Sequence, residues 1–176
     1  MRKSDGQRAV LRTVLLVGEG YAEVAFIAHL RSLYPSRGFG LAITVKNARG
    51  MGALSVVNFA IRLGQNFDYD FTMALLDSDA GWDDKTQNIA RRGKVQVVPC
   101  NPCLEAMLLA LHGEVQQGRS SSHHKHAFQN KFGKSANDIS VYAKNFPKEF
   151  LEKARVKSPE LESLLALLTS TTNQSP

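Results

Sequence analysis

The stretch LLVGEGYAEVAF, residues 15–26, joins one apolar run to a second apolar pattern through a turn with two glycines. The run VLRTVLLV, residues 10–17, is short, rich in β-branched residues and bounded by glycine, which predicts a buried β-strand. Between residues 21 and 34 the apolar residues keep helical spacing, at Val24, Ile27, Ala28 and Leu30. The stretch therefore predicts a strand followed directly by a helix.

The same alternation continues along the chain. Apolar runs predict further strands, and the segments between them predict helices: strands at 41–45, 71–77 and 95–99, helices at 53–63 and 83–92. Strands that alternate with helices are typical of a parallel sheet covered on both faces, with right-handed crossovers. We therefore predict an α/β fold with a mostly parallel four-stranded sheet flanked by helices.

The segment after the fourth predicted strand carries helix signals. Asn101 is a natural N-cap and Pro102 suits the first helical position, so we predict a helix that begins there and carries an apolar stripe to Leu111. The run RSSSHHKH, residues 119–126, is polar and predicts a loop. A last short helix is predicted from Ser158 and Pro159 onward.

The C-terminal part of the chain differs in charge from the rest. Residues 119–157 hold nine Lys or Arg and three acids. We expect an α/β core over residues 9–113 and a basic, mainly helical extension over residues 114–176 that packs on it.

Composition limits the class of protein. With 176 residues, 43% hydrophobic and 22% charged, the chain fits about one globular domain. Arg12 interrupts the N-terminal apolar stretch, and no run approaches the roughly 20 apolar residues that a membrane helix needs. We expect no membrane association and a cytoplasmic location. The net charge of +6 favours a polyanionic partner.

Acidic residues gather behind the first and third predicted strands. There is no Asp or Glu between Val24 and Phe67, whereas the turns after those two strands hold Glu19, Glu23, Asp77, Asp79, Asp83 and Asp84. Strand ends of a parallel sheet share one edge, where ligands bind. Carboxylates placed together favour Mg²⁺ or Mn²⁺. The alternative is structural: Glu23 complements a helix N-terminus, and Asp79 and Asp83 cap the following helix.

These motifs resemble a known superfamily. The acid-glycine turn, the Asp77-Ser78-Asp79 run after the third strand and the two β-α units between them resemble a Toprim domain. The run NPCLE, residues 101–105, with His112 after it, is similar to a stretch of RloB-like proteins, a prokaryotic branch related to OLD-type nucleases. The resemblance implies a Rossmann-like fold, metal-dependent phosphoryl transfer on DNA or RNA, a role in defence and an ATPase partner.

The resemblance also implies roles for individual residues. Asp77, Asp79 and Glu23 would hold one or two Mg²⁺ ions, and Glu19 would bind metal or act as general acid or base. Glu105 either completes the site or only stabilises its own helix. Three lysines either contact phosphates or belong to a solvated face: Lys125, Lys131 and Lys134. A non-catalytic nucleic-acid-binding or regulatory subunit with the same fold is the alternative function.

Two other constellations compete with the metal site. Cys100 and Cys103 have the spacing of a thiol redox pair, and with the histidines at 123, 124 and 126 they offer zinc ligands. The histidine spacing is shorter than usual for zinc, and we expect both thiols to be buried packing residues. A dinucleotide fingerprint is disfavoured because Glu23 stands at the third glycine position.

Overall fold

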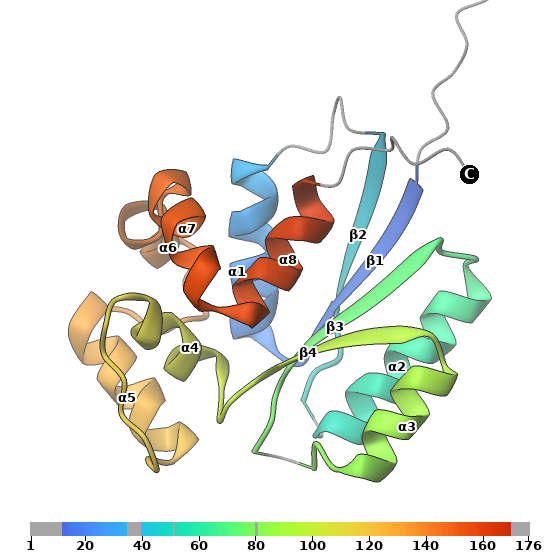
Figure 1. Cartoon of the computed structure of the whole chain (residues 1–176), viewed down its shortest axis with the longest axis horizontal. Coiled ribbons are helices and arrows are strands. Elements are labelled where there is room, and N and C mark those ends of the chain that lie inside the picture. The colour runs from blue at the N-terminus through green and yellow to red at the C-terminus, as the bar shows by residue number, and fades with distance from the viewer. Residues whose placement is uncertain (1–11, 35–39, 51, 80, 170–176) are drawn as a thin grey trace, which may run out of the picture.

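The computed structural model describes residues 12–34, 40–50, 52–79 and 81–169, and its centre is a four-stranded parallel sheet (Figure 1). The strands are β1 (Arg12–Gly18), β2 (Leu41–Asn47), β3 (Phe71–Asp77) and β4 (Val95–Cys100). Their order across the sheet is β2-β1-β3-β4, and each neighbouring pair is parallel. The predicted α/β fold is confirmed. Residues 10 and 11 of the predicted first strand lie outside the described residues.

Strand β1 is buried on both faces. Residues Val14 to Val17 are each at most 2% exposed. Successive side chains of a strand point to opposite faces, so Val14 and Leu16 join one hydrophobic cluster while Leu15 and Val17 join the other. The continuous apolar run therefore reflects a central strand with helices on both sides.

Helices cover the two faces unequally. Helices α2 (Ala53–Asn66) and α3 (Asp84–Arg92) cover one face, where Ala53, Val57 and Ala90 meet the sheet (Figure 1). The other face carries α1 (Tyr21–Leu33) and the helices after β4. These are α4 (Leu104–Leu111), α5 (Ser121–Phe132), α6 (Ser140–Asn145), α7 (Lys148–Ala154), the 3₁₀ turn η1 (Arg155–Lys157) and α8 (Pro159–Thr169).

The basic C-terminal segment packs on α1 through aromatic side chains. Tyr142 lies with its ring centroid 5.5 Å from that of Phe26 on α1, and Phe146 lies 5.7 Å from Tyr142. Phe128 and Phe146 are both completely buried. This segment therefore shares one hydrophobic cluster with the sheet.

Two local predictions are wrong. Helix α4 begins at Leu104 with Cys103 as its N-cap, not at Asn101, because the backbone N–H of Leu104 donates to the Asp77 carboxylate (3.0 Å) at the end of β3. Most of the predicted loop over residues 119–126 belongs to α5, whose N-cap Ser120 accepts from the next turn. Burial of this helix against the core outweighs the weak helix propensity of its serines and histidines.

In the part of the chain that the structure describes, no helix is both long and apolar enough to cross a membrane.

Candidate metal and phosphoryl-transfer site

The sheet has a topological switch point between β1 and β3, where the connections to the next strand change direction. The chain moves from β1 outward to β2, then returns past β1 to β3 and on to β4. Such a switch point opens a crevice outside the carboxyl ends of the strands. Glu19 directly follows β1, and Asp77 is the last residue of β3.

Glu19 and Asp77 meet at this point. The backbone N–H of Asp77 donates to the Glu19 carboxylate at 3.0 Å, and the Glu19 N–H donates to the Leu75 carbonyl at 3.0 Å. The side chain of Glu19 therefore lies across the end of β3 and not out in solvent. Strand ends that are 58 residues apart in sequence thus bring two carboxylates to one place.

Glu23 lies beside them in the first turn of α1. Its carboxylate accepts from the Gly20 N–H at 2.7 Å, which satisfies an amide of the helix N-terminus, and its side chain is only 5% exposed. The helix approaches β1 closely here: a Cβ on Gly18 would lie 2.9 Å from the Cβ of Glu23 and 2.9 Å from the backbone nitrogen of Val24. The structural role expected of Glu23 is therefore real, but it also places the acid at the switch point.

Asp77 connects three elements. Its Oδ1 accepts from the Leu104 N–H of α4, and its Oδ2 lies 3.5 Å from the Lys125 ammonium of α5. Asp79 is exposed and accepts a hydrogen bond from the Ser121 hydroxyl at the start of α5. Helix α5 is thus fixed to the acidic strand end by two polar contacts.

Glu105 adds a further carboxylate from the first turn of α4. It is 5% exposed, and its Oε2 has no hydrogen-bond partner among the residues that the structure describes. A buried carboxylate oxygen without a donor is costly unless a proton, a cation or a ligand satisfies it.

The four buried or half-buried carboxyl groups at the switch point all have raised pKa values. Burial raises the pKa of Glu19, Asp77 and Glu105 above the ordinary value. Burial and then the charge of Asp77 raise the pKa of Glu23 to about 7. Burial lowers the pKa of Lys125, but the charges of Glu105 and Asp77 outweigh it and leave that pKa raised. One ammonium thus faces several carboxylates that burial and mutual repulsion disfavour as anions.

The chemistry of the donors fits a hard divalent cation. All are carboxylate oxygens, the ligand type that Mg²⁺ and Mn²⁺ prefer, and one of them is a buried oxygen without a partner. Within the described ranges no group of three His, Cys, Asp or Glu side chains is placed so that it could hold a metal ion as it stands. Backbone amides hold three of these carboxylates in place. Glu23 accepts from the N–H of Gly20, Glu19 from that of Asp77, and Asp77 from that of Leu104.

The remaining acids behind β3 have a different role. Asp83 is the N-cap of α3 and accepts from the Thr86 N–H at 2.8 Å, as the structural alternative expected. Asp84 lies exposed in the first turn of the same helix. Asp79 does not cap α3.

Of the three predicted phosphate-contacting lysines, the structure brings one to the acids. Lys125 faces Asp77, whereas Lys131 pairs with Glu114 (2.5 Å) and Lys134 pairs with Asp138 (3.0 Å). These two ion pairs are largely on the surface, where such contacts exchange readily with other charges.

The two cysteines are buried, as predicted, and both are free thiols. Burial raises the pKa of Cys103 to about 12 and that of Cys100 well above its ordinary value. Cys100 contacts the Met107 sulfur at 3.9 Å. His123 is hydrogen-bonded to Gln116 at 2.6 Å. Thiols held protonated in this way are weak nucleophiles and weak ligands.

Residues beyond the predicted set also border the site. Tyr21, the first residue of α1, stands between Glu19 and Glu23 in the sequence and is 70% exposed. Ser121 reaches Asp79 from α5. The aromatic residue inside the acidic turn was a visible signal for Tyr21, whereas Ser121 lies in a segment predicted to be a loop and gave no signal.

Comparison with known proteins does not extend this description, because neither a protein-family model nor a curated protein matches the sequence.

Proposed function

We propose that the protein is a Mg²⁺- or Mn²⁺-dependent enzyme of phosphoryl transfer on nucleic acid, in practice a nuclease. The observation that carries the proposal is the meeting of Glu19, Glu23, Asp77 and Glu105 at the switch point of the sheet, with Lys125 as their neighbouring ammonium. Buried carboxylates with raised pKa values are a common mark of a functional site. The Toprim resemblance supports the same reading.

Each residue has a role under this proposal. Asp77, Asp79 and Glu23 would hold the metal, and Glu105 would add an oxygen from α4. A bound divalent cation supplies neutralisation of the charge that develops on the phosphoryl oxygens. Burial raises the pKa of Glu19, which favours a role for this carboxyl group as general acid or base.

The same edge offers contacts for a nucleic acid. Lys125 is half-exposed and lies beside Asp77. Its ammonium could therefore leave Asp77 and contact a phosphate of the substrate when the carboxylate binds a metal. The exposed ring of Tyr21 is a platform on which an unpaired base can stack. The net charge of +6 favours the association with a polyanion.

The second candidate is a non-catalytic nucleic-acid-binding or regulatory subunit. The Lys125–Asp77 ion pair favours it, because the ammonium already provides Asp77 with the positive charge that a metal would supply. The ATPase partner implied by the resemblance belongs to either candidate.

The deciding experiment compares three proteins: the unaltered chain, Asp77→Asn and Asp84→Asn. Asn keeps an oxygen for the Leu104 N–H, and Asp84 is an exposed acid near the same edge. Each is incubated with labelled single-stranded DNA, duplex DNA and RNA in Mg²⁺, Mn²⁺ or EDTA. Metal-dependent cleavage that Asp77→Asn abolishes and Asp84→Asn retains supports the enzyme.

The opposite result is also clear. Salt-sensitive nucleic-acid binding without cleavage, equal in all three proteins and unaffected by EDTA, would refute the enzyme and support the binding subunit.

A further inference from the structure

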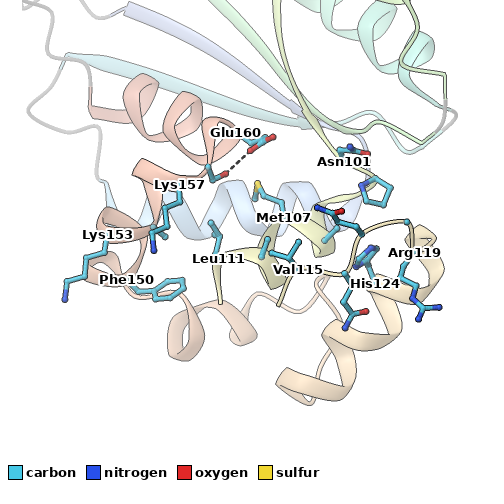
Figure 2. Close-up of a pocket in the computed structure, with 18 residues that line it drawn as sticks. Asn101, Met107, Leu111, Val115, Arg119, His124, Phe150, Lys153, Lys157 and Glu160 are labelled. Carbon is cyan, nitrogen blue, oxygen red and sulfur yellow. Dashed lines mark hydrogen bonds between the residues drawn. The ribbon is translucent and has the colours of Figure 1, made fainter. Parts of the chain in front are cut away.

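A cavity that none of the four acids of the site lines lies beside the end of β4, on the side of the C-terminal helices. It has a volume of about 860 Å³ and lies between α4, the segment before α5, the first turns of α5, and the α7–η1–α8 region (Figure 2). We call it the α4–α8 pocket. Its size falls within the roughly 300 to 1,000 Å³ of small-molecule sites.

One wall of the pocket contains a buried histidine without a partner. His124 is 2% exposed, and neither of its ring nitrogens has a partner within hydrogen-bond geometry in the described parts of the chain, although the backbone of Arg119 lies close enough to raise its pKa in part. Burial, and then the neighbouring His123, lower the pKa of His124, which favours the neutral ring; a neutral imidazole offers one donor and one acceptor. Buried polar groups are nearly always paired, so this ring indicates a ligand that bears both an acceptor and a donor.

The pocket is bordered by unpaired cations. Arg119 lies at one end and Lys153 and Lys157 at the other (Figure 2). Among the described residues none of the three makes an ion pair, whereas Lys131, Lys134 and Arg155 of the same basic half all do. The one carboxylate of the lining, Glu160, already accepts from the Ser158 hydroxyl at 2.9 Å. The pocket therefore favours an anion.

The centre of the pocket is apolar. Met107 and Leu111 of α4, Val115 and the ring of Phe150 lie between the two cationic ends (Figure 2). Val115 is 65% exposed and leaves this part of the pocket apolar towards solvent. A flat or apolar body fits between these side chains. An aliphatic acid would supply the charge and the apolar body, but it would leave the ring of His124 unpaired.

We propose that the α4–α8 pocket binds a nucleoside phosphate. The base would lie against Phe150 and the apolar side chains, its polar edge would pair with the ring of His124, and the phosphate would contact Lys153, Lys157 or Arg119. This ligand has a negative charge for the cations, a flat body for the apolar side chains and hydrogen-bonding groups for the ring of His124.

The pocket and the acids share the first turns of α5. Ser121 contacts Asp79 and Lys125 contacts Asp77, while His124 between them borders the pocket. The nucleoside phosphate has two sources: a free nucleotide, or one nucleotide of a bound strand. The first source is independent of the proposed function, and the second rests on it.

The test is calorimetric titration of the full chain with AMP, GMP, CMP and UMP, with adenosine and inorganic phosphate as partial ligands. At least one monophosphate should bind more tightly than either partial ligand. Lys157→Ala and the pocket-filling Ala110→Trp should each weaken that binding about tenfold or more, which corresponds to about 1.4 kcal/mol. Ala110 lines the pocket but is exposed, so its replacement leaves the core intact. Lys85→Ala, an exposed lysine on α3, is the matched control and should bind as the unaltered chain does.

Further measurements distinguish a free nucleotide from a nucleotide of a bound strand, and failure of this proposal from failure of the proposed nuclease. If both pocket variants also weaken the binding of a short oligonucleotide, the ligand is a nucleotide of a strand; if they leave it unchanged, the ligand is free. Asp77→Asn should not alter monophosphate binding. The binding proposal can therefore be judged even if the protein proves not to be a nuclease. No monophosphate binding at millimolar concentration, or equal loss in Lys85→Ala, would overturn the proposal.

Discussion

The substitution Glu23→Gln should make the protein more stable at alkaline pH. The pKa of Glu23 is raised to about 7, first by burial and then by the charge of Asp77. Gln has almost the same shape and keeps a carbonyl oxygen for the Gly20 N–H, but it carries no charge. The variant therefore removes the cost of an ionised buried acid and retains the contact that supports α1.

The size of the effect follows from proton linkage. The folded protein holds the Glu23 proton more tightly than the unfolded chain, so stability falls as pH rises from 4.5 to about 7. Each pKa unit corresponds to about 1.4 kcal/mol, so the loss approaches about 3 kcal/mol above neutral pH. For a chain of this length that is roughly 6 to 12 °C in Tm. At about pH 5, where folded Glu23 is still protonated, the variant and the unaltered protein should be nearly equal.

Urea unfolding followed by circular dichroism at about pH 5 and about pH 8 measures this difference. Glu149→Gln is the matched control, because Glu149 also lies in a first helical turn, that of α7, but is exposed. Millimolar Mg²⁺ at the higher pH should stabilise the unaltered protein more than Glu23→Gln, since a bound cation would neutralise the acids. A stability gap between Glu23→Gln and the unaltered chain that is the same at both pH values would refute the reasoning.

Three further outcomes are expected. Asp77→Asn should unfold within about 1 kcal/mol of the unaltered protein, since it keeps the α4 contact, whereas Asp77→Ala should lose about 1 to 2 kcal/mol in urea unfolding; equal losses would contradict the capping role. Gly18→Ala should lose about 1 to 3 kcal/mol, because the added Cβ would lie 2.9 Å from the backbone of Val24, and an unchanged Tm would show that the turn relaxes freely. Cys100 and Cys103, whose pKa values are raised by burial, should react with a thiol reagent only after unfolding, and rapid labelling of native protein would contradict their burial.

Local sequence patterns were sufficient to predict a parallel sheet and the alternation of strands and helices along the chain. The apolar runs that became β1 and β3 are dense enough to be strands only if both faces are covered, and helical periodicity between them placed α1 and α2. Glu19 and Asp77 could be placed at one edge because all strand ends of a parallel sheet lie on the same side. That prediction needed no knowledge of side-chain contacts.

The start of α4 and the helical state of residues 121–126 could not be read locally. The first is fixed by Asp77, 27 residues earlier, and the second by burial of Phe128 and His124 against other helices. Propensity is a weak force of a few tenths of a kcal/mol per residue, so a single long-range hydrogen bond or a buried ring overrides it.

The sequence by itself thus determined the parallel sheet, its helical cover and the gathering of acids at the carboxyl edge of the sheet, because each follows from periodicity and chain direction. Only the tertiary structure decided the strand order, the contact of Lys125 with Asp77, the buried and unpaired oxygen of Glu105, which interacts electrostatically with Asp77, and the place of His124 beside a pocket between cations. These contacts join residues from separate helices and strands, and their energies depend on burial and distance, which exist only once the chain has packed.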